Sequence, residues 1–90
     1  MLEKYINHPT FGLLTRICLV DDYSSLFTTL YAQRLFFLIK VTTSGGLVFE
    51  TVSRNDAKLM IETRLRLLRR LGEGEEHNSL HMLYKRNFSH

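Results

Sequence analysis

The hydrophobic period of this chain changes at Ser53, and that change constrains the fold more than any other feature of the sequence. Before Ser53, apolar residues come in short runs separated by turn residues, as in β-strands. After Ser53 they recur every three or four residues, as in amphipathic helices. We therefore predict an α+β protein with two parts, residues 1–53 and residues 54–90.

The first part is predicted to form a small antiparallel sheet or barrel, because its strand-like runs are joined by brief turns. Asp21-Asp22 and Ser44-Gly45-Gly46 mark two of these turns, the second because glycine permits the positive φ of a tight hairpin. The predicted strands are 11–20, 25–31, 35–42 and 47–52. The stretch 5–14 is expected to be only a strand lead-in, with Gly12 allowing a close backbone approach.

The run Leu35-Phe36-Phe37-Leu38-Ile39 is apolar on both faces of its predicted strand. Two arrangements satisfy this pattern. Either both faces are covered within the fold, one of them by the C-terminal helices, or one face is kept for a partner.

The second part is predicted to be a helical hairpin. Ser53 is the expected N-cap of a first helix that ends near Leu71. A Gly-containing link, 72–76, should separate it from a shorter helix over 78–88. The apolar stripe expected on the first helix consists of Ala57, Met60, Ile61, Leu65, Leu68 and Leu71.

No catalytic or metal-binding pattern is found in the 90 residues, and a chain of this length has little room for a deep active site. We therefore expect a protein without enzymatic activity. Cys18, the single cysteine, is predicted to be a small core residue, as suits a reducing cytoplasm. His77 and His81 share a helix face but lack a third ligand, so two solvated imidazoles are favoured over a metal site. The longest apolar run is too short for a membrane span, and we expect a cytoplasmic protein.

The net charge of +3 comes entirely from residues 54–90, because residues 1–53 carry equal numbers of basic and acidic side chains. The basic run Arg64–Arg70 on the first helix suggests nucleic-acid binding through phosphate contacts. A solvated helix face explains the same arginines and is favoured, since Arg69 and Arg70 near the helix end offset its dipole.

Two blocks of the sequence carry a family resemblance. They are Asn7-His8-Pro9-Thr10-Phe11-Gly12-Leu13-Leu14 and Leu30-Tyr31-Ala32-Gln33-Arg34-Leu35-Phe36-Phe37-Leu38. With Arg54-Asn55 and the run 64–70, they resemble the PipX (PII-interacting protein X) family of cyanobacteria over nearly the whole chain.

This resemblance implies a fold and a function. The fold is a Tudor-like (KOW-type) β-barrel followed by two helices. The function is that of a nitrogen-regulation adaptor, which either coactivates the dimeric transcription factor NtcA or is sequestered by the trimeric PII signalling protein. Such a chain binds no cofactor itself, because its partners sense 2-oxoglutarate, ATP and ADP. It is also not expected to bind specific nucleic-acid sequences or to associate with a membrane. A KOW-type nucleic-acid-binding module using the arginine helix is the alternative.

The resemblance also implies which residues meet the partners. Tyr31, Arg34 and Leu35 would belong to a surface shared by NtcA and PII. Glu3 and Tyr5 would matter chiefly toward PII. Tyrosine and arginine are common interface anchors, one as a rigid amphipathic ring and the other as a planar multidentate donor.

Overall fold

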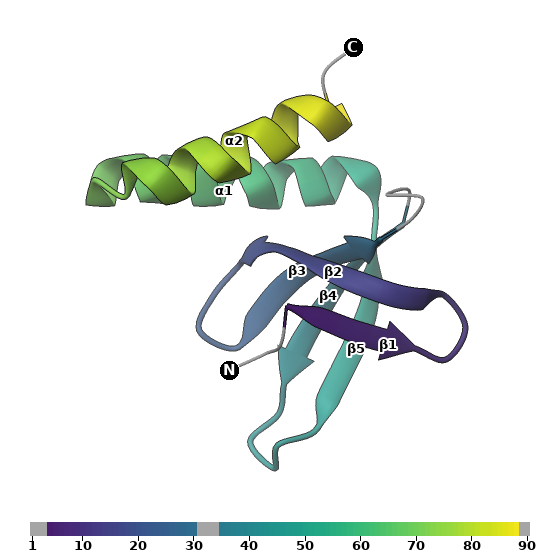
Figure 1. Cartoon of the computed structure of the whole chain (residues 1–90). Coiled ribbons are helices and arrows are strands. Elements are labelled where there is room, and N and C mark those ends of the chain that lie inside the picture. The colour runs from purple at the N-terminus through teal and green to yellow at the C-terminus, as the bar shows by residue number, and fades with distance from the viewer. Residues whose placement is uncertain (1–3, 31–34, 89–90) are drawn as a thin grey trace.

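The computed structural model of the chain describes residues 4–30 and 35–88. Five strands come first and two helices follow, so the predicted α+β class is confirmed (Figure 1). The strands are β1 (Tyr5–His8), β2 (Gly12–Leu19), β3 (Ser24–Thr29), β4 (Phe36–Val41) and β5 (Leu47–Val52). The helices are α1 (Arg54–Leu71) and α2 (Gly74–Phe88).

The strands form one antiparallel sheet in the order β1-β2-β3-β4-β5, and each pairs with the next along the chain. The sheet curls into a half-barrel below the helices (Figure 1). A shift of register in β2 between Arg16 and Cys18 marks a bulge, which locally increases strand twist. The barrel-like part expected from the sequence is thus present.

The strand β1 was not predicted as a separate strand. Its four residues are ended by Pro9, and the pairing of His8 with Gly12 closes a tight hairpin onto β2. The other glycine turn was predicted correctly: Gly45 has φ 89° and donates to the carbonyl of Thr42 at 2.9 Å. Short strands give little periodicity, so β1 is recognisable only through its pairing.

Local signals set the ends of α1. The Ser53 hydroxyl accepts a hydrogen bond from the Asp56 amide at 3.1 Å, and Gly72 ends the helix with φ 74°. The prediction of a buried apolar stripe is confirmed for Ala57, Ile61, Leu65 and Leu68, which are buried. It is wrong for Leu71, which is exposed because the helix extends past the sheet at this end.

The helix α2 begins at Gly74, one turn earlier than the predicted start at Asn78. The link is correspondingly shorter, and the His77 amide already donates to the carbonyl of Glu73 at 2.9 Å. Glu75 and Glu76 lie in the first turn, where the helix dipole favours carboxylates. At the other end, the Arg54 guanidinium lies 4.6 Å from the Phe88 ring centroid, so the start of α1 meets the end of α2 in the expected hairpin.

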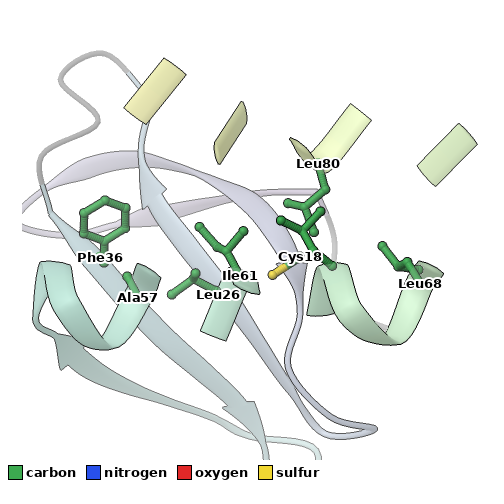
Figure 2. Packing of buried hydrophobic residues seen from close by; sticks show 8 residues of the cluster. Cys18, Leu26, Phe36, Ala57, Ile61, Leu68 and Leu80 are labelled. Atoms are coloured by element: carbon green, nitrogen blue, oxygen red, sulfur yellow. The ribbon is translucent and has the colours of Figure 1, made fainter. Parts of the chain in front are cut away.

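The helices pack on one face of the sheet and create the larger of two buried clusters. Side chains from β2, β3, β4, α1 and α2 point toward one another there (Figure 2). The helix-side cluster consists of Cys18, Leu26, Phe36, Ala57, Ile61, Leu65, Leu68 and Leu80. The apolar run of β4 is therefore covered by helices on one of its faces.

The opposite face of the sheet buries a smaller set, which we call the inner cluster: Leu14, Phe27, Phe37 and Ile39, with Ile6 packed against them. Phe36 and Phe37 thus contribute to different clusters, as the pleat requires. No helix in the described part of the chain combines the length and apolar character needed to cross a bilayer.

Candidate functional site

One end of the sheet brings together the two sequence blocks that carry the family resemblance. The β1–β2 turn, the end of β3 and the start of β4 all lie there, as the pairing registers require. The Leu30 amide donates to the Leu13 carbonyl at 3.0 Å, which joins the blocks directly. We call this end the turn end of the sheet; the β4–β5 turn lies at the other end.

The turn between β1 and β2 is organised by His8. Its Nδ1 accepts hydrogen bonds from the amides of Thr10 at 3.0 Å and Phe11 at 3.2 Å. These two bonds fix the ring against the backbone of the turn. Gly12 follows with φ 77° and nothing within 4 Å of where a Cβ would lie. The prediction of a close backbone approach at Gly12 is therefore wrong: glycine is suited here because of the left-handed backbone.

Aromatic rings gather around His8. Its ring centroid lies 5.0 Å from that of Phe11, 5.7 Å from Phe37 and 5.4 Å from Phe49. Phe37 is buried, whereas Phe11 and Phe49 are 43% and 36% exposed. The His8 ring thus links β1 to β5 by side-chain contact across the curled sheet. Partly exposed rings fixed by neighbours are suited to binding a protein partner.

Two of the predicted partner-binding residues are described, and both are exposed. Tyr5 in β1 is 49% exposed and Leu35, just before β4, is 44% exposed. Tyr5 is opposite Thr15, which is opposite Thr28. The Thr28 hydroxyl donates to the Leu35 carbonyl at 2.8 Å, so Tyr5 and Leu35 lie at the same level of the sheet. Glu3, Tyr31 and Arg34 lie outside the described residues.

The pleat places Tyr5 and Leu35 on different sides of the sheet. Register partners share a face, so Tyr5 lies on the face of Phe36. Leu35, one residue before Phe36, points to the other face. A partner that touches both must therefore cover the rim at the turn end.

Comparison with known protein families gives one match. The family described as PipX: PII-interacting protein X matches residues 2–88, which is nearly the whole chain. The chain belongs to the PipX family. The comparison with curated proteins finds no match. The PipX family is described by a protein interaction and not by a reaction, which agrees with the expectation of a regulatory adaptor.

The cysteine of this PipX-family chain is structural in character. Cys18 lies in the helix-side cluster, and burial raises the pKa of its thiol to about 12. At neutral pH the thiolate nucleophile is essentially unpopulated. The prediction of a core cysteine is confirmed.

The histidines and arginines of the helices divide between the surface and the helix–sheet junction. The His77 and His81 rings stack at 5.8 Å, and no group of three metal-ligating side chains is found in the described residues. Arg66, Arg69 and Arg70 are exposed as expected for a solvated face. Arg64 was expected to join them but is only 19% exposed, with Nη2 3.4 Å from Glu76.

Proposed function

We propose that this chain is a cytoplasmic adaptor of nitrogen regulation that binds the PII signalling protein or, in a separate complex, the transcription factor NtcA. PII is a trimer that sequesters the chain. NtcA is a dimer, and the chain coactivates NtcA when NtcA has bound 2-oxoglutarate. The chain itself performs no reaction and holds no cofactor. The partners sense 2-oxoglutarate, ATP and ADP, and these ligands shift which complex forms.

The observation that carries the proposal is the convergence of both resemblance blocks at the turn end of the sheet. Tyr5 and Leu35 are exposed at this level of the sheet, on its two sides, and the partly exposed ring of Phe11 lies in the β1–β2 turn. A rim of exposed apolar and aromatic side chains supported by a rigid sheet is favourable for protein recognition. The family description, which names PII, supports PII as one partner.

The residue roles follow from the same proposal. Tyr31, Arg34 and Leu35 contact both partners, so the two complexes exclude each other. Glu3 and Tyr5 contribute chiefly to the complex with PII.

The experiment uses size exclusion and calorimetry. The chain is mixed with PII and ADP, and ATP with 2-oxoglutarate is then added; NtcA with 2-oxoglutarate is titrated separately. We expect a PII complex with ADP that dissociates on the addition, and an NtcA complex in the second titration. Absence of complexes with both proteins would falsify the proposal. A salt-sensitive shift of DNA or RNA by the chain alone would instead support the nucleic-acid-binding alternative.

Matched variants test the surface. Leu35→Ala should weaken both complexes about tenfold, whereas Leu19→Ala should not. Leu19 has nearly the same exposure, 41% against 44%, but lies at the end of β2 beside the β2–β3 turn, at the other end of the sheet. Tyr5→Ala should weaken chiefly PII binding, with exposed Tyr23→Ala as its control. Equal losses in a variant and its control contradict the assignment of the surface. The same assay applies to Tyr31→Ala, which should weaken both complexes.

A further inference from the structure

A hollow of about 600 Å³ lies between α1 and the end of the sheet that carries the β2–β3 turn. Its volume falls within the range of small-molecule sites in proteins. Most of its lining is apolar and comes from Leu19, Val20, Tyr23, Val41 and Leu67. The hollow is at the other end of the sheet from Leu35, so it is separate from the candidate partner surface.

Arg64 and Arg16 supply positively charged groups to this largely apolar lining, Arg64 from α1 and Arg16 from β2. The Nε of Arg64 is buried and has no hydrogen-bond partner in the described structure. Its Nη2 makes one long contact of 3.4 Å with the Glu76 carboxylate. A buried N–H without an acceptor is unfavourable, and a guanidinium binds carboxylates well through its fork of donors. The guanidinium is thus weakly paired, and a carboxylate in the hollow would be a better acceptor for it than Glu76 at 3.4 Å.

The opposite rim of the hollow carries Asp21 and Asp22. The Asp21 carboxylate accepts a hydrogen bond from the Tyr23 amide at 2.8 Å, and this bond lowers the pKa of Asp21. Asp21 is thus negatively charged at neutral pH and repels an anion from its rim. The two rims together favour a ligand whose acid group lies at the Arg64 side.

We propose that this hollow binds a small amphiphilic carboxylic acid, with its hydrocarbon body against Val41 and Leu67 and its carboxylate accepting from Arg64. The apolar lining would hold the hydrocarbon body of the ligand, and the weakly paired guanidinium of Arg64 would hold its carboxylate. This inference does not depend on the proposed PII and NtcA complexes.

The first test uses the unmodified chain and three probes: octanoate, octan-1-ol and propionate. Each is titrated below its aggregation concentration into ¹⁵N-labelled protein and followed by amide chemical shifts. Octanoate should saturate, with the largest shifts near Tyr23, Val41 and Leu67. Octan-1-ol lacks the charge and propionate lacks the body, so each should bind at least about tenfold more weakly. Failure of octanoate to saturate, shifts located elsewhere, or equal affinities for octanoate and octan-1-ol would overturn the proposal.

The second test uses variants on α1. Arg64→Met keeps an apolar stem and should weaken octanoate binding about tenfold, while the affinity for octan-1-ol stays unchanged. The control is Arg66→Met, which replaces an exposed arginine of the same helix. Leu67→Trp should fill the hollow and weaken both probes, and Leu59→Trp, on the exposed side, should weaken neither. Unchanged octanoate affinity in Arg64→Met contradicts the proposal. If a variant does not fold, the probe series on the unmodified chain still decides the question.

Discussion

The two faces of the half-barrel differ in what covers them. On one face, α1 and α2 bury the helix-side cluster of eight residues (Figure 2). On the other, the inner cluster has four buried members, and its cover comes from the curl of the sheet and from rings that remain partly exposed. One face is thus closed by the helices, while the other leaves the rings of Phe11 and Phe49 partly exposed.

This difference gives the two faces of one small sheet separate roles. Burial of apolar area against the helices supplies stability, at about 25 cal/mol per Å². Rings at the rim keep part of their area exposed and available to a partner, so they contribute less to folding. Substitutions on the two faces should therefore separate loss of stability from loss of binding.

The largest expected effect is on the helix-covered face. Ile61 of α1 is 1% exposed, so Ile61→Ala removes buried methyl groups and leaves a cavity. We expect a loss of about 2–5 kcal/mol in the free energy of unfolding, measured by urea denaturation. Leu59→Ala, two residues earlier and 58% exposed, should change it by less than about 0.5 kcal/mol. Equal losses would show that the helices do not cover this face in solution.

The second effect concerns Cys18 and alkaline pH. The unfolded thiol loses its proton near the ordinary pKa of 9.0, whereas the folded thiol keeps it up to a pKa of about 12. The contribution of the protonated Cys18 thiol to the free energy of unfolding is therefore full below pH 9. It is lost as pH rises through about 12.

The measurement compares urea denaturation of the wild type and Cys18→Ala at about pH 8 and about pH 10. The wild type should lose about 1 kcal/mol more than the variant, because other groups titrate equally in both. The same pH dependence in the two proteins would mean that Cys18 is accessible to solvent and that the helices open readily.

A smaller effect on stability, with a larger one on binding, is expected at the rim. His8→Ala removes the acceptor of two amide hydrogen bonds and the ring that contacts Phe49. We expect a loss of about 1 kcal/mol in stability and a weaker complex with PII, measured by calorimetry. The control is His81→Ala, an exposed histidine of α2, which should change neither quantity. Unchanged PII binding by His8→Ala would remove the aromatic rim from the proposed interface.

Local signals in the sequence were enough to predict much of this fold. The N-cap at Ser53, the positive φ angles at Gly45 and Gly72, and the 3.6-residue stripe of α1 each depend on residues close together in the sequence. Other features depend on contacts between distant residues. Arg64 pairs with Glu76 of α2, and the first turn of α2 forms over residues expected to be a linker.

The candidate site was predicted less completely, for a related reason. The partner-binding residues came from the family resemblance, because an exposed tyrosine or leucine has no periodic signal of its own. His8 and Phe49 are 41 positions apart in the sequence and meet through the curl of the sheet, which propensities do not specify. The sequence therefore did not predict that the rings of Phe11 and Phe49 both contact His8.

The smallest effect is expected where the helix-side face extends beyond the helices, toward the β4–β5 turn. There Lys40 and Glu50 form an ion pair at 3.1 Å with both side chains about half exposed, at 44% and 50%. Solvent screens such a pair, so Glu50→Gln should lower the free energy of unfolding by no more than about 0.5 kcal/mol. A double-mutant cycle with Lys40→Gln in urea, repeated at high salt, measures the coupling. A coupling above about 1 kcal/mol that survives salt would show that this end of the face is also shielded from water, and the contrast between covered and open surfaces would then be weaker.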